Sequence, residues 1–484
     1  MNRRNFIKNS SLLGASLALH PFLKGLAEER KLNIIVLLSD DQRHDTIGAL
    51  GNKDIITPNL DALVKNGTAF TQAHVFGGLS GAICQPSRAM LLTGRTLFSI
   101  DRQARDNQEF SFDIFNNYVT FPELLRKNNY NTVGIGKQHN GTTIYNRAFS
   151  DGAKVFFGGM GDQYNLPVQD YKADNSYGGP KDNNYAPNKV NESKGKHSSE
   201  LFADETIHFI EKYKKEPFLI YTAFTTPHDP RRAPAEYNQW YADKKVSLPP
   251  NFLPQHPFDN GELKVRDELL APFPRTEEDT IRQIKEYYAT ISHLDAQIGR
   301  IVKAVYENGL AENTLIVFAG DNGLAIGQHG LFGKQSIYEH SNRVPLIFSG
   351  PGIPKNQKVD GYCYLSDIYA TLAEKSDVKI PSSVQGISLA KAFKDPKTPL
   401  RRALYFAFKH FQRGVKKDGF KLLEYNVDGN RHTQLFNLKE DPWEMHNLAD
   451  EPECKAKKQA LKAELLKLKV EFADTFSSFW NGYS

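Results

Sequence analysis

Residues 32–41, LNIIVLLSDD, decide the fold class of this chain. The run from 32 to 38 is almost entirely apolar, and Ser39, Asp40 and Asp41 follow it. A short apolar run with polar residues at its carboxyl end is typical of a β-strand that is buried on both faces. Such strands occur in parallel sheets whose two faces are covered by helices. This stretch therefore predicts an α/β fold.

Similar apolar runs recur along the chain, and helical patterns lie between them. The further strand-like runs are 132–135, 218–224, 314–319 and 345–348, and the helical stretches are 59–65, 121–127, 200–213 and 277–308. This alternation predicts a large, mostly parallel sheet between layers of helices. In such sheets the ligand site lies beyond the carboxyl ends of the strands. Four predicted strand ends carry polar residues there: Asp40-Asp41, Lys137, His228 and Asp321-Asn322.

The pattern changes after residue 381. Short strand-like runs at 403–409, 420–425 and 434–437 precede an amphipathic stretch at 451–472. These features predict a smaller C-terminal α+β subdomain with an antiparallel sheet. We expect the catalytic domain to span 28–375 and the subdomain to span 376–484.

Residues 1–27 have the composition of an export signal. They combine four cations and no acid with an apolar run at 11–19 and small residues near 25–27. The Arg3-Arg4 pair resembles a twin-arginine signal, and an ordinary secretory signal is the alternative. The apolar run is too short to span a bilayer, and no later segment is long and apolar enough. We expect an exported, periplasmic or secreted protein without a membrane span.

Charge and cysteine content exclude two further classes. Of the 61 Lys and Arg residues, four lie in the export signal, so the remainder balances 57 cations against 56 acids, or +1. A nucleic-acid partner is not expected, because nucleic-acid binders concentrate positive charge on one face. Three cysteines cannot form a disulfide framework. Cys363 and Cys454 are expected as small buried apolar side chains.

Residues 84–95, CQPSRAMLLTGR, contain the most specific motif. They resemble the sulfatase signature Cys-x-Pro-Ser-Arg with Thr-Gly downstream. GKQH at 136–139, Pro227-His228, DNG at 321–323 and GLFGK at 330–334 follow in the order found in that family. The chain is identified as resembling the formylglycine-dependent type I sulfatases, bacterial polysaccharide and aryl sulfatases among them, over about residues 30–480. The resemblance implies an alkaline-phosphatase-like fold and a maturation enzyme that oxidises Cys84 to formylglycine.

The candidate metal ligands are all oxygen donors. Asp40, Asp41, Asp321 and Asn322 offer carboxylate and amide oxygens, which select Ca²⁺ or Mg²⁺ over Zn²⁺. Three carboxylates at one site would repel each other without a cation. The resemblance favours one Ca²⁺ and adds the modified side chain of Cys84 to its ligands.

The resemblance also implies roles for the other candidate residues. Formylglycine from Cys84 would hydrate, attack sulfur through one hydroxyl and release sulfate when the second hydroxyl loses its proton. The candidate roles are as follows: Arg88 holds the hydrate and the carboxylates, His139 is the base, Lys137 and Lys334 bind the sulfate oxygens, and His228 with Lys334 protonates the leaving alkoxide. Gln138 and Asn140 depart from the apolar residues that the family often has there, which leaves the fit of the substrate open.

Two long insertions, 151–197 and 229–276, could be substrate walls or solvated loops. Their polar composition favours a sulfated carbohydrate, an oligosaccharide of ulvan, carrageenan or a glycosaminoglycan. His410 and Arg413 are candidates for binding it from the subdomain, and His329 could line the site or support its loop. The alternatives are an arylsulfatase, a phosphodiesterase or phosphonate hydrolase of the same superfamily, and a non-catalytic carbohydrate-binding relative.

Overall fold

The computed structural model describes residues 31–100, 118–177, 191–192 and 195–483. The predicted export signal at 1–27 lies outside these residues. In the described part of the chain, no helix combines the length and the apolar character that a membrane crossing needs.

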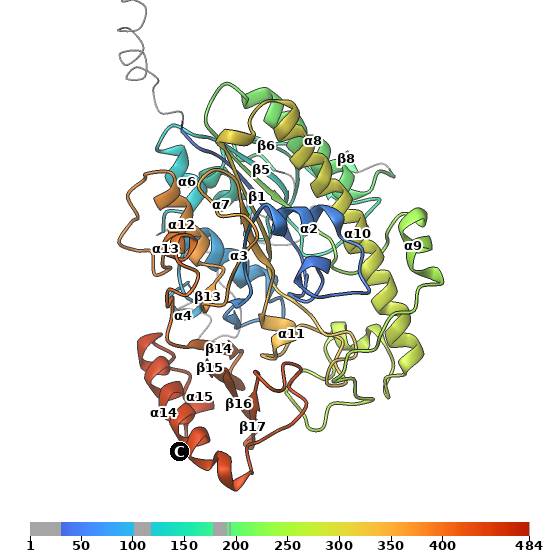
Figure 1. Ribbon diagram of the computed structural model, residues 1–484, viewed down its shortest axis with the longest axis vertical. Coiled ribbons are helices and arrows are strands. Elements are labelled where there is room, and N and C mark those ends of the chain that lie inside the picture. The colour runs from blue at the N-terminus through green and yellow to red at the C-terminus, as the bar shows by residue number, and fades with distance from the viewer. Residues whose placement is uncertain (1–30, 101–117, 178–190, 193–194, 484) are drawn as a thin grey trace, which may run out of the picture.

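An eight-stranded sheet forms the centre of the molecule (Figure 1). Its strand order is β12-β2-β11-β10-β1-β9-β5-β6. The strands are β1 (Asn33–Ser39), β2 (Gly67–Phe70), β5 (Asn131–Lys137), β6 (Asp151–Phe156), β9 (Phe218–Ala223), β10 (Thr314–Gly320), β11 (Leu346–Ser349) and β12 (Gln357–Val359). Only β11 runs antiparallel to its neighbours, so the predicted large, mostly parallel sheet is confirmed.

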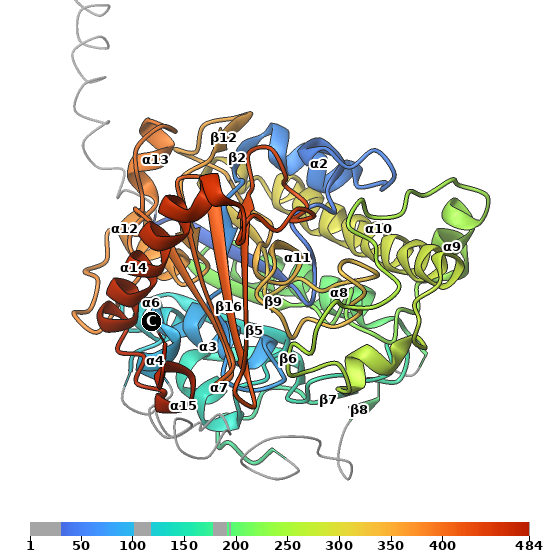
Figure 2. The same cartoon turned by 90° about the horizontal axis from the view of Figure 1, so that it is seen from below.

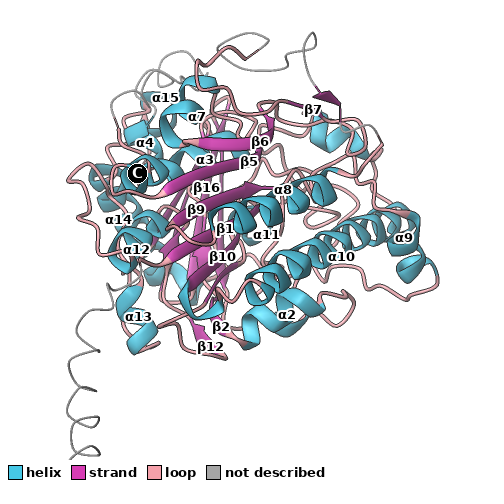
Figure 3. Cartoon of the chain, turned by 90° about the horizontal axis from the view of Figure 1, so that it is seen from above, coloured by secondary structure: helices cyan, strands magenta, loops and turns pink. Residues whose placement is uncertain are grey.

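Helices cover both faces of this sheet (Figure 3). One face packs against α2 (Pro58–Lys65), α8 (Ser198–Tyr213) and α10 (Glu277–Glu307). The other packs against α3 (Cys84–Thr93), α6 (Phe121–Arg126), α7 (Thr142–Ala148) and α12 (Asp367–Lys375). Alternate residues of β1 pack in the cores on the two faces of the sheet, because successive side chains along a strand point to opposite sides. Ile35 and Leu37 lie in the first core, and Ile34, Val36 and Leu38 in the second.

The register of the central strands brings three polar strand ends together. Ser39 pairs with Gly320, and Leu38 pairs with Ala223, so β1, β10 and β9 end at the same level. The backbone N–H of Asp40 donates to Thr226 O at 3.0 Å, and that of Asp321 donates to Ser39 O at 3.0 Å. The polar residues that follow these strands therefore lie at one edge of the sheet, as the strand pattern predicted.

A second, five-stranded sheet carries the C-terminal part of the chain (Figures 1 and 2). Its order is β17-β16-β15-β14-β4. The strands are β4 (Gly77–Gly78), β14 (Leu404–Phe408), β15 (Gln412–Lys417), β16 (Phe420–Val427) and β17 (Asn430–Asn437), with helices α14 (Lys455–Glu471) and α15 (Ser477–Trp480) beside them. Strands β14 to β17 are antiparallel, as expected, while β4 joins in parallel from the N-terminal part of the chain.

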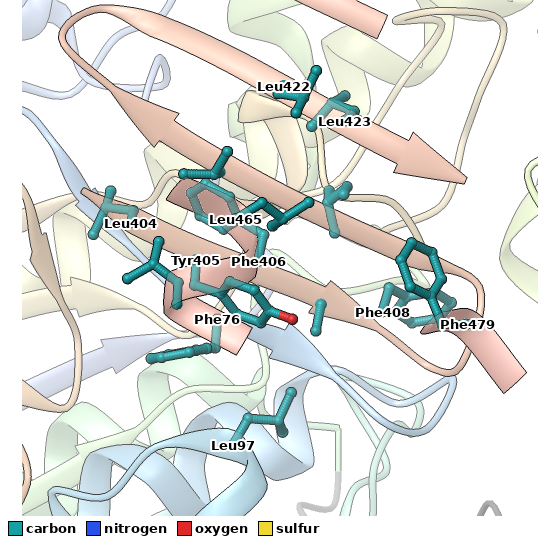
Figure 4. Packing of buried hydrophobic residues seen from close by; sticks show 14 of the residues in the cluster. Phe76, Leu97, Leu404, Tyr405, Phe406, Phe408, Leu422, Leu423, Leu465 and Phe479 are labelled. Carbon is teal, nitrogen blue, oxygen red and sulfur yellow. The ribbon is translucent and has the colours of Figure 1, made fainter. Parts of the chain in front are cut away.

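One apolar core joins the second sheet to the catalytic part (Figure 4). Phe76 and Leu97 from the first hundred residues pack in the same cluster as Tyr405, Phe406 and Leu465. A segment after the expected domain boundary also contacts the catalytic part. Leu389 and α13 (Ala390–Lys394), which follow the expected boundary at 376, pack in a core of the large sheet.

The insertions are more ordered than the sequence indicated. Residues 151–156, expected as part of an irregular insertion, form the edge strand β6 of the large sheet. The second insertion contains α9 (Ala235–Ala242). The expected C-terminal strands also omitted β15, because its sequence QRGVKK lacks a continuous apolar run.

Candidate active site

The helix α3 begins at Cys84 and places that residue at the floor of the site. All ten residues of α3 are buried, and Cys84 is 1% exposed. Its Sγ lies 3.3 Å from His139 Nδ1, 3.7 Å from Lys137 Nζ and 4.0 Å from Lys334 Nζ. Burial raises the pKa of the Cys84 thiol, and the two lysines only partly oppose this. An unmodified Cys84 therefore stays protonated near neutral pH.

Two carboxylates lie beside the sulfur, and a third adjoins one of them. One oxygen of Asp40, one oxygen of Asp321 and Cys84 Sγ are all within 4.8 Å of one another. Asp41 has left-handed backbone (φ 63°), and its N–H donates to Asp321 Oδ1 at 3.1 Å. The Asn322 amide donates to Asp41 Oδ1 at 2.6 Å. The strand ends thus deliver the predicted set of oxygen donors to one place.

Each carboxylate has a buried cation as its partner. Lys137 Nζ lies 2.5 Å from Asp40 Oδ2, and Lys334 Nζ lies 2.8 Å from Asp41 Oδ1. Arg88, one helical turn after Cys84, donates through Nε to Asp321 Oδ2 at 2.8 Å. The same guanidinium donates to Lys137 O at 2.6 Å, which ties α3 to β5. These pairs are buried and charge-assisted, which fixes the geometry of the site.

The pKa values of the three aspartates are shifted in different directions from their ordinary values. Burial raises the pKa of Asp321, and the nearby charge of Asp40 adds to this, to about 6. Burial also acts on Asp40 and Asp41, but the surrounding cations overcome it and hold both pKa values below the usual range. Two oxygen atoms, Asp40 Oδ1 and Asn322 Oδ1, are buried without a hydrogen-bond partner among the described residues.

Two histidines line the site together with Cys84. His139, with left-handed backbone (φ 53°), faces Cys84, and burial lowers its pKa well below the ordinary value. His228 Nδ1 lies 2.8 Å from Asp229 O, and it carries the hydrogen because a carbonyl oxygen only accepts. His228 Nε2 lies 3.5 Å from Asp41 Oδ2. Burial lowers the pKa of His228 to about 4.

A cavity of about 490 Å³ opens above these groups, a size typical of small-molecule sites. Its lining joins the floor to both insertions and to the C-terminal sheet. The lining residues are Gly81, Ala82, Cys84, Gln85, His139, Gly158, Gly159, Met160, His228, Glu262, Val265, Arg266, Asp267, Lys334, Gln335 and Lys409.

Comparison with known proteins decides the family. The sequence model of the family described as Sulfatase matches residues 32–378. A second model, described as N-sulphoglucosamine sulphohydrolase, C-terminal, matches residues 327–471. This chain belongs to the sulfatase family. It is accordingly a sulfuric ester hydrolase with the alkaline-phosphatase-like fold.

This sulfatase is similar to proteins of Formosa agariphila and Bacteroides thetaiotaomicron. It is 28% identical to an ulvan-active sulfatase of Formosa agariphila, over 93% of this chain and 83% of the relative. It is 25% identical to the N-acetylglucosamine-6-O-sulfatase of Bacteroides thetaiotaomicron, over 92% of this chain and 88% of the relative.

Solved structures share the fold of this sulfatase. One was solved in complex with its substrate D-glucosamine-2-N,6-O-disulfate (TM-score 0.74, 22% identity, 93% of this chain and 100% of that chain). Another is the phosphonate monoester hydrolase of Agrobacterium radiobacter (TM-score 0.71, 20% identity, 91% of this chain and 96% of that chain).

The structure brings most of the sequence-predicted residues of the sulfatase together, but not all of them. The residues that meet at the site are Asp40, Asp41, Cys84, Arg88, Lys137, His139, His228, Asp321, Asn322 and Lys334. The expectation for Arg413 is wrong. Its guanidinium is fully buried, bonds Asp474 at 2.5 Å and lies among phenylalanine rings, so it cannot reach substrate. His410 contacts Phe411 and does not line the cavity.

His329 supports its loop. It is buried, its ring stacks on Tyr338 with centroids 4.0 Å apart, and its Nε2 lies 3.0 Å from Asn251 Nδ2. Cys363 is buried as an apolar side chain, as expected, and Cys454 is partly buried.

Sequence reasoning missed part of the cavity wall. Lys409, directly after β14, lines the cavity in place of the expected His410. The rule that polar residues at strand ends line a site would have found it. Arg266 and Asp267 lie inside an insertion without any periodic signal, so only the folded chain reveals them.

Proposed function

We propose that this sulfatase hydrolyses a sulfate ester of a sulfated carbohydrate, with a formylglycine made from Cys84 and one Ca²⁺ ion. The observation that carries this proposal is the position of Cys84 Sγ, within 4.0 Å of two lysines and one histidine and beside Asp40 and Asp321. Burial keeps the thiol protonated, which makes cysteine itself a poor nucleophile. An aldehyde at this position would hydrate to a gem-diol, and a hydroxyl oxygen of that diol would serve as the nucleophile in place of the thiol.

The residues present fit a hard divalent cation. Asp40, Asp41, Asp321 and Asn322 supply only oxygen, and Asp40 Oδ1 and Asn322 Oδ1 lack a hydrogen-bond partner among the described residues. These four residues and the side chain at position 84 would hold Ca²⁺. When bound, the ion neutralises charge on the sulfate group and balances the carboxylates.

The side chains around position 84 have complementary tasks. Lys137 and Lys334 direct their ammonium groups at this position, where they bind sulfate oxygens and stabilise the charge of the transition state. His139 Nδ1 is placed to accept a proton from the side chain of residue 84. Arg88 orients Asp321 and is a positioning residue for the carboxylate cluster.

Protonation of the leaving group is assigned to His228 with Lys334. Both residues line the cavity beside position 84, where the alkoxide departs. The hydrogen bond from His228 Nδ1 to Asp229 O fixes the ring and leaves Nε2 as the exchanging atom; because the free imidazole is neutral, with a pKa of about 4, Nε2 must first receive a proton, and the ammonium of Lys334 is the group that can supply one to the leaving oxygen.

The substrate class follows from the cavity wall and the relatives. Nine of the sixteen lining residues have polar or charged side chains, and Met160 and Val265 are the larger apolar ones, whereas an aryl sulfate needs an apolar slot. Relatives include an ulvan-active and an N-acetylglucosamine-6-O-sulfatase. We propose an oligosaccharide of ulvan, carrageenan or a glycosaminoglycan as substrate, a formylglycine-generating enzyme as maturation partner, and export to the periplasm by the signal at 1–27.

A direct test uses protein co-expressed with a maturation enzyme. Intact mass should show replacement of the thiol and one hydrogen of Cys84 by oxygen, and sulfate should be released from defined sulfated oligosaccharides. Cys84→Ala should bind the same oligosaccharides without turnover. A tenfold preference for phosphodiesters, phosphonate esters or simple aryl sulfates would assign the enzyme to another substrate class. Binding without turnover by the modified protein would identify a non-catalytic relative.

The metal has an independent test in thermal unfolding. Ca²⁺ at one hundred times its dissociation constant should stabilise the folded state by about 2.7 kcal/mol. A chelator should reverse this shift. Asp40→Asn should weaken it, because the variant loses a charged oxygen donor. An unchanged melting temperature in Ca²⁺ and in chelator would contradict the metal assignment.

A further inference from the structure

One side of the active-site cavity is built from residues that the chemistry does not use. The outer wall consists of Glu262, Arg266 and Asp267 from the second insertion, together with Lys409 from the end of β14. These residues line the same cavity as Cys84, His139 and Lys334. A sugar whose sulfate reaches the floor can therefore contact the outer wall with its remaining substituents.

Both cations of the outer wall are already paired with carboxylates. Lys409 Nζ forms an ion pair with Glu262 Oε1. Arg266 pairs with Asp229, which lies behind the wall, and with Asp267 Oδ1 at 2.8 Å. The pairs thus contain two cations and three carboxylates, Asp229 included. At the cavity floor, by contrast, the proposed Ca²⁺ would offset the carboxylates that pair with the lysines there.

This charge balance distinguishes between substituents of a sugar. A second sulfate or a uronic carboxylate would meet no unpaired cation on the outer wall, and the carboxylates there would repel it. Hydroxyl groups fit the wall better, since they donate to carboxylates and accept from Lys and Arg. Glu262 lines the cavity, although only 4% of it is exposed, and its Oε1 is the atom that pairs with Lys409.

We infer that the sulfated ring in this cavity carries its sulfate as the only anion, and that the Glu262–Lys409 pair binds neutral hydroxyls of that ring. The inference rests on the proposed function and narrows it. It assigns the substrate to sulfated neutral hexoses or N-acetylhexosamines, and it disfavours doubly sulfated sugars and sulfated uronic acids.

The test compares kcat/KM within matched sugars. The substrates are the positional isomers of monosulfated galactose and N-acetylglucosamine, the disulfated forms of the same sugars, and a sulfated uronic acid. The enzyme is the formylglycine-containing protein, verified by mass. We expect kcat/KM for the best monosulfated sugar to exceed that for its disulfated form by tenfold or more.

Glu262→Gln probes the outer wall itself. The change keeps the shape, removes one negative charge and leaves Lys409 unpaired, so the preference for the monosulfated sugar should fall tenfold or more. A ratio measured within one protein does not depend on the fraction of enzyme that is folded or modified. Glu236→Gln, the same change on the exposed helix α9, should leave the ratio as it is in the wild type.

Two results would overturn the inference alone: a wild-type preference for disulfated or uronic substrates, or an unchanged ratio in Glu262→Gln. A verified formylglycine protein that releases sulfate from none of these sugars or longer oligosaccharides would instead overturn the proposed function, and the inference with it.

Discussion

At the scale of single residues, the proposed sulfate-binding role of Lys137 has a direct test. The ammonium of Lys137 is fully buried, pairs with Asp40 and lies 3.7 Å from Cys84 Sγ. Lys137→Ala should lower kcat by about 10²–10³-fold, the usual effect of deleting one donor that stabilises developing charge. Steady-state kinetics on a sulfated sugar measures this. Lys303→Ala, at an exposed position of α10, should keep wild-type kcat. Equal kcat in both variants would contradict the role of Lys137.

His329 allows a prediction about acid stability. Burial lowers the pKa of this side chain to about 3, whereas the unfolded chain has an ordinary histidine near 6.5. The unfolded state therefore binds a proton below pH 6.5 that the folded state does not, and stability falls as pH falls. Between pH 7.5 and 5 the contribution is about 2 kcal/mol.

His329→Asn should remove this pH dependence, since Asn tolerates the left-handed backbone (φ 53°) but does not titrate. The variant should be less stable than wild type at pH 7.5, because the stacking on Tyr338 is lost. The gap should narrow by about 2 kcal/mol at pH 5. Urea unfolding at both pH values measures it, and a constant gap would show that His329 is protonated in the folded protein.

At the scale of elements, a carboxylate of α10 caps the N-terminus of helix α2. Asp295 Oδ2 accepts from Asn59 N at 3.1 Å, and Oδ1 accepts from Leu60 N at 2.6 Å. Thr57, the residue at the N-cap of α2, provides no side-chain cap. The start of α2 is thus held by a residue more than two hundred positions away, and the two helices are fixed to each other.

Asp295→Ala should lower the free energy of unfolding by about 2–3 kcal/mol, because it leaves two backbone N–H groups at the helix start without a partner. Urea denaturation measures the change. Asp243→Ala, at an exposed position after α9, serves as the control and should stay within about 0.5 kcal/mol of wild type. A similar result for both variants would mean that water or a rearranged side chain caps α2.

At the scale of the whole molecule, a buried charge cluster joins the two sheets. Glu339 of α11 (Glu339–Asn342) lies 2.6 Å from Lys416 of β15 and 2.9 Å from Lys421 of β16. His74 Nε2 lies 3.3 Å from the same carboxylate. The cations overcome the effect of burial and hold the pKa of Glu339 well below its ordinary value. The carboxylate therefore remains charged in the interior and fixes the C-terminal sheet on the catalytic part.

Glu339→Ala should destabilise the protein by about 3–5 kcal/mol, since it leaves two buried lysines without their main partner. Glu374→Gln, at an exposed position of α12, should have little effect.

Because Phe76 and Leu97 share a core with the C-terminal sheet, wild type should unfold in one transition by fluorescence and circular dichroism. Two separate transitions would show that the units fold independently.

The sequence by itself determined the α/β class, the parallel strands and the residues at their ends. Apolar runs such as 32–38 report burial on both faces directly, and the motif at 84–95 marks the proposed nucleophile locally. The confirmed fold and family follow from those signals. The site geometry was also foreseeable in outline, because parallel strands end at one edge of a sheet.

Only the tertiary structure determines which residues form the outer wall of the cavity and that Arg413 is buried in an ion pair. Asp474, the partner of Arg413, lies 61 positions further along the chain. No local sequence pattern therefore shows that the Arg413 guanidinium forms a buried ion pair. Arg266 and Asp267 reach the cavity through an insertion without periodicity, whose path depends on what it packs against. Strand and helix periodicities report which face is buried, whereas the partner of a charged side chain is set by distant segments that meet only in the folded chain.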